Sequence, residues 1–257
     1  MKKRTKILWP FLLIFFSACL TPAEKKNNYL ALRKKMVQEQ IVARGIKNKK
    51  VIEAMLKAPR HEFIPEKYRK IYDPHGDHPV PIGEGQTISQ PYIVALMTEL
   101  LTEETRKTEN ARPDQVGGKR KKILEIGTGS GYQAAILAEI YPQVYTIEII
   151  ESLAKQAERT LKLLGYQKVK VKHGDGYLGW KEYAPFDGII VTCAPDHIPE
   201  PLIEQLKERG RMVIPVGEYP NQTLYLVEKR AGQIIKKAVI PVLFVPMTGE
   251  EIRKQKK

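Results

Sequence analysis

A glycine-rich segment is the first place in this sequence where residue types and spacing suit chemistry. It reads Gly127-Thr128-Gly129-Ser130-Gly131 and follows an apolar stretch that ends in Glu125-Ile126. Glycines there let the backbone adopt positive φ angles and approach a ligand closely, and the N-terminus of a following helix offers free N–H groups. Tyr132 stands where the dinucleotide pattern G-x-G-x-x-G needs its last glycine, which disfavours NAD or FAD. A plain tight turn is the alternative.

Two acidic residues strengthen the case for a ligand site. Glu148 ends the next predicted strand, where its carboxylate can accept hydrogen bonds from both hydroxyls of a ribose. Asp175 lies between Gly174 and Gly176 after the third strand, where it can meet an adenine amino group. These residues lie at successive carboxyl ends of parallel strands, in the order of an S-adenosylmethionine site. The alternatives are a solvent-facing strand end for Glu148 and an ordinary Asp-Gly turn for Asp175.

The elements that position these residues follow from an alternation of strand and helix patterns after residue 122. We expect strands or helices, in turn, at residues 123–126, 132–140, 144–148, 152–164, 169–171, 188–192, 200–207 and 211–216. This alternation predicts an α/β, Rossmann-like fold in which a mostly parallel sheet has helices on both faces. Residues 223–228 and 234–240 flank Ala231-Gly232 and predict a C-terminal antiparallel hairpin at the sheet edge.

The N-terminal half has a different pattern. Apolar spacing predicts helices at residues 28–45, 51–57 and 91–101, whereas prolines and glycines exclude long regular structure from 58 to 89. Loops of that length are usually functional. We therefore expect one domain over 27–257. Its parts are N-terminal helices and a substrate loop (27–101), an exposed insertion (102–121), a cofactor-binding core (122–248) and a basic tail (249–257).

Composition excludes several classes of protein. The 257 residues include 43 Lys and Arg against 29 Asp and Glu, a net charge of +14, and residues 1–26, 102–122 and 251–257 carry most of that excess. Charge runs of this kind usually stay solvated, so we expect basic appendages and no nucleic-acid partner. Only Cys19 and Cys193 occur, which excludes a disulfide framework and a cysteine-rich zinc module.

The first 26 residues have the layout of an export signal. Basic residues precede an apolar run over 7–16, and Ser17-Ala18-Cys19 follows like a bacterial lipobox. A lipid on Cys19 would anchor a soluble body at a membrane surface. The alternatives are a buried N-terminal helix and a protein that starts at Met36.

Several segments, taken together, resemble the protein-L-isoaspartate O-methyltransferases over about Met36 to Thr248. They are residues 36–45, Pro59-Arg60-His61-Glu62-Phe63, Gly85-Gln86-Thr87-Ile88-Ser89-Gln90-Pro91, residues 124–132, Gly174-Asp175-Gly176, Val191-Thr192-Cys193-Ala194-Pro195 and Val245-Pro246-Met247-Thr248. Ordered motifs over such a span are far more specific than the glycine turn alone.

The resemblance implies methyl transfer from S-adenosylmethionine to the free α-carboxylate of isoaspartyl residues in damaged proteins. The ester then closes to a succinimide, whose hydrolysis returns some normal aspartate. Ser89 matches the active-site serine of the family. The positions that the family pattern and the turn assign to the cofactor are Gln86, Thr87, Ile88, Glu125, Gly127, Thr128, Gly129, Gly131, Glu148, Asp175, Gly176 and Thr248. The resemblance also leads us to expect a monomer.

Two other functions stay open: carboxyl methylation of a different acceptor, and an exported module that binds the cofactor without turnover. The compartment is open too, because the cofactor is made in the cytoplasm while residues 1–26 indicate export.

Histidines raise the question of a metal. His75 and His78 with Asp73 and Asp77 suggest one, but we expect a solvated turn and no metal, since no second cluster of ligands follows. We expect His61 to be a structural loop residue.

Overall fold

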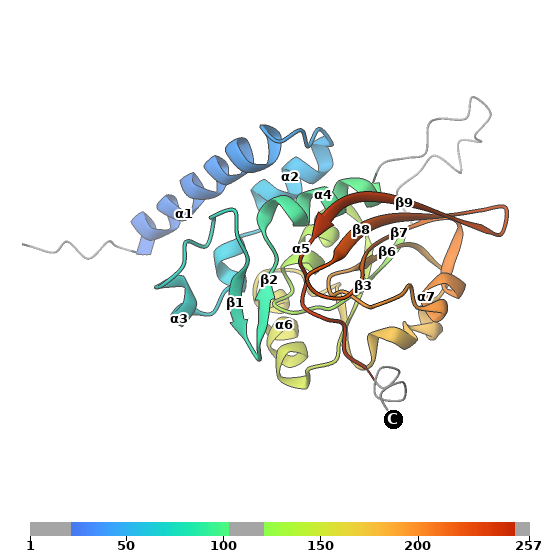
Figure 1. Cartoon of the computed structure of the whole chain (residues 1–257). Coiled ribbons are helices and arrows are strands. Elements are labelled where there is room, and N and C mark those ends of the chain that lie inside the picture. The colour runs from blue at the N-terminus through green and yellow to red at the C-terminus, as the bar shows by residue number, and fades with distance from the viewer. Residues whose placement is uncertain (1–21, 103–120, 250–257) are drawn as a thin grey trace, which may run out of the picture.

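A seven-stranded sheet forms the centre of the protein (Figure 1). The computed structural model describes residues 22–102 and 121–249. Cys19, nearly all of the predicted insertion and the basic tail after residue 249 lie outside these ranges. The sheet has the order β5-β4-β3-β6-β7-β8-β9. Its strands are β3 (Lys122–Ile126), β4 (Gln143–Glu148), β5 (Lys170–His173), β6 (Phe186–Val191), β7 (Leu206–Val216), β8 (Gln222–Arg230) and β9 (Gln233–Val242).

The predicted α/β fold is confirmed. Strands β5, β4, β3, β6 and β7 run parallel, and β8 and β9 add the antiparallel hairpin at one edge. Strand β3 is buried on both faces, as parallel strands are when helices cover them. The chain leaves β3 toward β4 and β5, then returns to pair β6 on the other side of β3. Such a reversal of direction is where open α/β sheets bind ligands, outside the carboxyl ends of the strands.

Helices cover the two faces of the sheet unequally. One hydrophobic cluster joins Ile123, Ile190 and Val213 to α2, α4, α5 and α6, whereas the opposite face packs on α7 and two short 3-10 helices. The helical elements are α1 (Pro22–Met36), η1 (Val37–Val42, a π-helix), α2 (Lys49–Lys57), η2 (Arg60–Phe63), α3 (Glu66–Arg69), α4 (Pro91–Thr102), α5 (Tyr132–Ile140), α6 (Glu151–Leu163), η5 (Gly176–Leu178), η6 (Lys181–Tyr183) and α7 (Glu200–Glu204). Within the described ranges, none of these helices combines the length and apolarity that spanning a bilayer requires.

Element boundaries differ from the prediction at several places, three of which move a residue into another part of the fold. Helix α1 begins at Pro22, inside the segment assigned to the leader and linker, and continues through η1. Thr102, assigned to the insertion, is the last residue of α4. Helix α7 ends at Glu204, because the following residues already pair in β7.

The region predicted as a loop contains a small β-hairpin. Strand β1 (Val80–Gly83) pairs antiparallel with β2 (Gln86–Ile88), and Glu84 and Gly85 form the turn with φ of 52° and 68°. Two successive positive φ angles are typical of the tight turns that suit the twist of a hairpin. Strand β2 of the hairpin contains Gln86, Thr87 and Ile88, and Ser89 lies between this strand and the start of α4.

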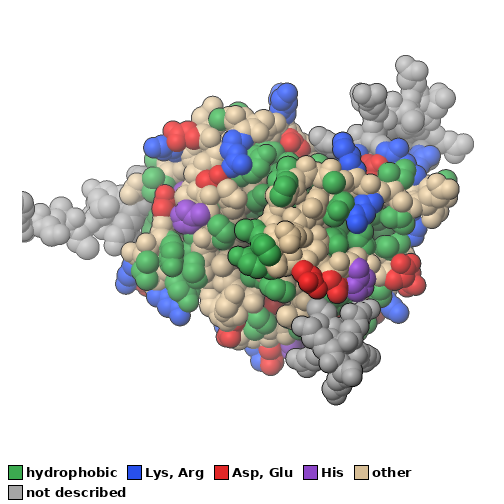
Figure 2. Space-filling view, viewed as in Figure 1, with side chains coloured by type: hydrophobic (Ala, Val, Ile, Leu, Met, Phe, Trp, Pro, Cys, Tyr) green, Lys and Arg blue, Asp and Glu red, His purple; other side chains and the backbone are tan. Residues whose placement is uncertain are grey.

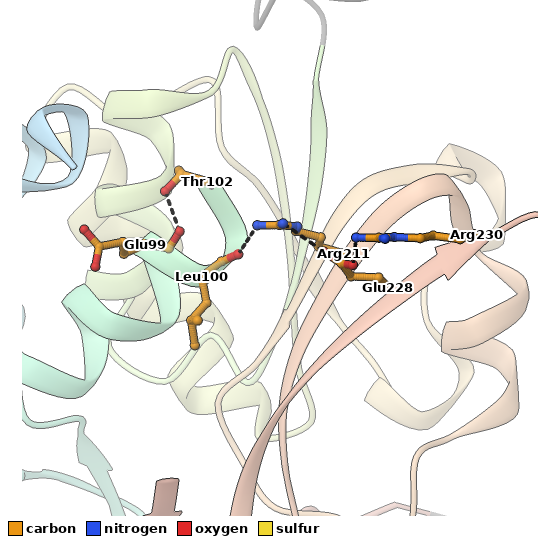
Figure 3. Close-up of polar contacts among 6 residues, drawn as sticks. All are labelled: Glu99, Leu100, Thr102, Arg211, Glu228 and Arg230. Carbon is orange, nitrogen blue, oxygen red and sulfur yellow. Dashed lines mark hydrogen bonds and ion pairs between the residues drawn. The ribbon is translucent and has the colours of Figure 1, made fainter. Parts of the chain in front are cut away.

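An arginine joins α4 to the sheet (Figure 3). Arg211 of β7 donates from Nη1 to the carbonyl oxygen of Leu100 at 3.0 Å, and its Nη2 lies 2.8 Å from Oε1 of Glu228 in β8. The Arg211 and Glu228 side chains are 11% and 13% exposed. The more exposed Arg230 pairs with the other oxygen of the same carboxylate. Since the last carbonyls of a helix have no partner within it, Arg211 satisfies one of them and fixes the end of α4.

We predict that Arg211→Ala lowers the free energy of unfolding by about 1–3 kcal/mol, because it leaves a shielded carbonyl and carboxylate short of a donor. Arg230→Ala is the matched control, since it removes an exposed arginine from the same carboxylate and should cost less than about 1 kcal/mol. Urea unfolding of both variants measures the difference. Equal losses would show that the contact with Leu100 contributes nothing.

Candidate active site

A cavity opens at the carboxyl ends of β3, β4 and β6. It holds about 800 Å³ of empty space, part of it open to solvent. The predicted site residues that line it are Gln86, Thr87, Ile88, Ser89, Glu125, Gly127, Thr128, Gly129, Glu148, Gly176 and Thr248. Gly131 and Asp175 are not among the lining residues. The structure thus brings together residues from the hairpin, the sheet and the C-terminal segment.

The glycine turn forms the floor of this cavity. The amides of Gly127 and Thr128 donate to the carbonyl oxygen of Ile147 at 2.9 and 3.2 Å, which ties the turn to β4. Gly127 has φ of 93°, and a Cβ there would lie 2.6 Å from Oγ1 of Thr192. Only glycine fits that position without displacing a neighbour. The tight turn and the ligand site are therefore the same feature.

Gly131, predicted as a cofactor-binding residue, lies at the start of α5 and outside the cavity lining. It begins α5 with φ of 89°, and a Cβ there would lie 3.2 Å from Leu161 of α6. Gly131 therefore lets two helices pack closely and does not line the cavity.

Glu148 faces the cavity and is only 5% exposed, so the solvent-facing alternative is wrong. Its Oε2 accepts a hydrogen bond from the amide of Gly129 at 2.7 Å, and its Oε1 accepts from the amide of Ile150 at 3.0 Å. A carboxylate has about four lone-pair sites, so capacity remains for donors of a ligand. Glu148 thus orders the glycine turn and presents an acceptor to the cavity.

Asp175 forms the turn that begins η5, and its predicted contact with an adenine amino group stays a prediction. Its Oδ1 accepts from the amide of Tyr177 at 2.9 Å and begins η5. The chain closes over it, because a Cβ on Gly249 would lie 2.6 Å from the same oxygen. Its neighbour Gly176 does line the cavity, packed against Ile126.

Glu125 is a fully buried carboxyl in the cavity wall. Among the described residues, neither of its oxygens has a hydrogen-bond partner. Burial, partly offset by the Thr146 hydroxyl and assisted by the Glu148 charge, raises the pKa of Glu125 to about 8. Buried polar atoms are almost always paired in native proteins. A ligand that brings hydrogen-bond donors or positive charge would therefore fit this wall.

A second cavity adjoins the first. It has about 1210 Å³ of empty space, and Thr87, Ser89, Thr192 and Val245 line both cavities. Its other lining residues are Pro79, Gln90, Ile93, Pro220, Pro241, Val242, Leu243 and Phe244. No charged or histidine side chain is among the described residues that line it. Figure 2 shows hydrophobic side chains gathered on this face, between the positions of the β1–β2 hairpin and β9 in Figure 1.

Ser89 lies at the junction of the two cavities. It is half-buried and follows β2 directly. Within the described part of the chain, its hydroxyl makes no hydrogen bond, so it is available to a ligand in either cavity.

The histidines lie away from both cavities. His75 is 2% exposed and His61 is 7% exposed, with the ring of His61 stacked on Tyr29 at 4.0 Å between centroids. Burial lowers the pKa of both His61 and His75 to about 4. The solvated turn expected around His75 is therefore wrong, because α1 covers it. Over residues 22–102 and 121–249, no group of three or more His, Cys, Asp or Glu side chains is arranged to hold a metal.

Sequence reasoning placed Thr192 and Cys193 in a family motif but named neither as a site residue. Both line the first cavity. Burial raises the pKa of the Cys193 thiol far above its usual range, and the nearby Glu148 and Glu125 add to this, so the thiol stays protonated. The signal that points to Thr192 is its place after β6, the strand beside β3 at the reversal of strand order.

Comparison with known proteins agrees with this geometry. Residues 31–252 match the family model described as protein-L-isoaspartate(D-aspartate) O-methyltransferase. A protein from Gloeobacter violaceus named protein-L-isoaspartate O-methyltransferase is 49% identical over 217 residues, which cover 84% of this chain and 98% of that protein. A protein from Shewanella sediminis named protein-L-isoaspartate O-methyltransferase 2 is 46% identical over 253 residues, or 96% and 97% of the two chains.

A solved structure is similar over the same span. It is a putative protein-L-isoaspartate O-methyltransferase from Plasmodium falciparum in complex with S-adenosyl-L-homocysteine. The TM-score is 0.68 at 28% identity, and the match covers 84% of this chain and 98% of that one. With the family model matching most of its length, this chain belongs to the protein-L-isoaspartate O-methyltransferase family.

Proposed function

We propose that this protein transfers the methyl group of S-adenosylmethionine to the free α-carboxylate of L-isoaspartyl residues in damaged proteins. The observation that carries the proposal is the meeting of two cavities at Ser89, one walled by carboxyls and one without charge. The first suits a cationic nucleoside cofactor, and the second suits a segment of polypeptide. Family membership supports the choice of isoaspartate over other acceptors.

The first cavity has the residues that the cofactor needs. Glu148 keeps lone pairs for the ribose hydroxyls, and Glu125 gives the wall a buried carboxyl without a partner. Ile126, Ile149 and Met247 line the same cavity and provide apolar surface for a base. When bound, S-adenosylmethionine supplies an electrophilic methyl group.

Ser89 orients the acceptor in this proposal. A carboxylate is already ionised at neutral pH and attacks as it stands, so the step requires no general base. This agrees with the absence of histidine from the described linings of both cavities. The Ser89 hydroxyl donates to one carboxylate oxygen and leaves the other free to form the new bond to carbon. Catalysis then rests on alignment and on the exclusion of water by the two cavity walls.

The uncharged lining of the second cavity limits how the acceptor is held. Hydrogen bonds from neutral groups such as Ser89 and Gln90 must replace water around its carboxylate, since no arginine or lysine is among the described lining residues. Leu243 lies in this wall and is 61% exposed, so apolar surface is available to the flanking residues of a polypeptide.

Repair follows from the product without further help from this chain. The next backbone nitrogen of the damaged protein attacks the ester carbonyl, methanol leaves, and a succinimide forms. Its hydrolysis yields a mixture of aspartate and isoaspartate, and repeated cycles restore aspartate.

The compartment and the assembly state are separate proposals. The basic, apolar and small residues up to Cys19 support export and lipid anchoring, whereas the supply of cofactor supports the cytoplasm. Cell fractionation with mass analysis of the mature N-terminus distinguishes them. For the assembly state we keep the monomer as a proposal.

The choice of acceptor is tested with two peptides that differ only at one residue. We predict that an isoaspartyl peptide accepts labelled methyl groups and that its aspartyl twin does not. Methyl incorporation measures both. Equal labelling of the twins would favour a methyltransferase for another carboxylate, and cofactor binding with no labelling of either would favour a module without turnover.

Ser89→Ala should lower kcat by about tenfold or more, because a donor that aligns the acceptor is lost, and should leave the dissociation constant of the cofactor within about twofold. Steady-state kinetics and calorimetry separate the two effects. Thr160→Ala is the control, since Thr160 lies on α6, lines neither cavity and makes no side-chain hydrogen bond within the described chain. An unchanged kcat in Ser89→Ala would remove this role.

Glu125 predicts a pH dependence of cofactor binding. With a pKa of about 8, its carboxyl is protonated in the free protein at neutral pH. A bound cation favours the ionised form and lowers that pKa. Binding should then release a proton below about pH 8 and strengthen as the pH rises toward that value. Calorimetry in two buffers with different ionisation enthalpies measures the release.

Glu125→Gln provides the control for that experiment, because an amide keeps the shape of the carboxyl and has no proton to release. A wild-type protein that releases no proton, or a Gln variant that still releases one, would contradict the assignment to Glu125.

A further inference from the structure

We propose that Thr192 is a positioning residue that holds the glycine turn and sets the polarity of the junction between the two cavities. This inference rests on the proposed function for its second part only. Its first part concerns the shape of the turn and applies to cofactor binding alone.

Thr192 is tied to the end of β3 by three contacts. Its amide donates to the carbonyl oxygen of Ile126 at 2.9 Å. Its Oγ1 lies 2.7 Å from the carbonyl oxygen of Gly127 and 3.1 Å from that of Ile126. Carbonyl oxygens only accept, so the Thr192 hydroxyl is the donor. The residue after β6 thus fixes the peptide group from which the glycine turn starts.

The Thr192 hydroxyl also occupies the space that a side chain on Gly127 would need. A Cβ at Gly127 would lie 2.6 Å from Oγ1 of Thr192, closer than real Cβ contacts. The two residues are therefore complementary in shape. Gly127 has no side chain, and the Thr192 hydroxyl occupies the space that this leaves and donates to the Gly127 carbonyl oxygen. If the Thr192 hydroxyl is removed, Gly127 loses this hydrogen bond and, as a glycine, can adopt other backbone conformations at the start of the turn.

Of the four residues that line both cavities, Thr192 is the one that follows a strand in the middle of the sheet. Thr87 and Ser89 come from the hairpin segment, and Val245 comes from the segment after β9. Because the Thr192 hydroxyl donates its proton to the Gly127 carbonyl oxygen, it can only accept hydrogen bonds from a ligand in the cavities. The Ser89 hydroxyl makes no hydrogen bond within the described chain and can donate.

The junction therefore has three hydroxyls, of which that of Thr192 only accepts while those of Ser89 and Thr87 can donate. An acceptor carboxylate is repelled by the Thr192 oxygen and attracted by the protons of Ser89 and Thr87, so it lies on the side of the hairpin segment that carries these two residues. Thr192 would thus affect cofactor affinity through the turn and acceptor position through polarity.

Three variants separate these effects from a loss of folding. Thr192→Val keeps the shape and removes the hydroxyl, Thr192→Ala removes the hydroxyl with less bulk, and Thr192→Ser keeps the hydroxyl. Thr223→Val is the matched control, because Thr223 lies in β8 of the same sheet and lines neither cavity. Calorimetry with S-adenosylmethionine gives Kd, kinetics with the isoaspartyl peptide give KM, and thermal unfolding gives Tm.

We expect the Val and Ala variants to bind S-adenosylmethionine about tenfold more weakly and to show a raised KM for the peptide. The Ser variant and Thr223→Val should stay within about twofold of the wild type. Val and Ala variants that bind normally, even with a lower Tm, would overturn the proposal, as would a Ser variant as impaired as Val. If Val does not fold, the comparison of Ala with Ser decides.

The calorimetric result also distinguishes this inference from the proposed function. A wild type that binds S-adenosylmethionine and leaves the isoaspartyl peptide unmethylated would refute the proposed acceptor. The order of Kd values among the Thr192 variants would still support or overturn the role in the turn.

Discussion

The peptide chain at the end of β3 is held from both sides, and the ligand-binding region depends on that constraint. From one side Thr192 bonds the Gly127 carbonyl, and from the other Glu148 accepts from the Gly129 amide. These residues follow or end β6 and β4, the two neighbours of β3 at the reversal of strand order. The glycines of this turn allow its positive φ angles, its neighbours hold it in that conformation, and the cavity floor is the result.

The rest of the site is assembled on that floor from distant parts of the chain. Ser89 reaches the junction from the β1–β2 hairpin, and α4, which follows it, is fixed to the sheet by Arg211. The opposite wall is the segment after β9, where the buried Gln222 side chain bonds both the amide and the carbonyl of Phe244. The two cavities therefore meet only when the N-terminal region, the sheet and the C-terminal segment are packed together.

The parts of this arrangement that the sequence predicts are those set by local pattern. Strand and helix periodicity places Gly127 and Glu148 at one edge of a sheet, because parallel strands end there together. Asp175 and Gly131 have the expected positions but lie outside the cavity lining, where Asp175 begins η5 and Gly131 precedes α5. The burial of His75 under α1 and the bond from Thr192 depend on long-range packing, which no local window contains.

The central claim is that the cofactor and the acceptor meet at Ser89, above the turn that Thr192 and Glu148 hold. A crystal structure with S-adenosylhomocysteine and an isoaspartyl peptide tests it most directly. We expect the ribose hydroxyls on Glu148, the peptide along the cavity lined by Leu243, and the sulfur within roughly 5 Å of the peptide carboxylate, near attack distance once a methyl group intervenes. A nucleoside bound elsewhere, or a sulfur turned away from Ser89, would contradict the account.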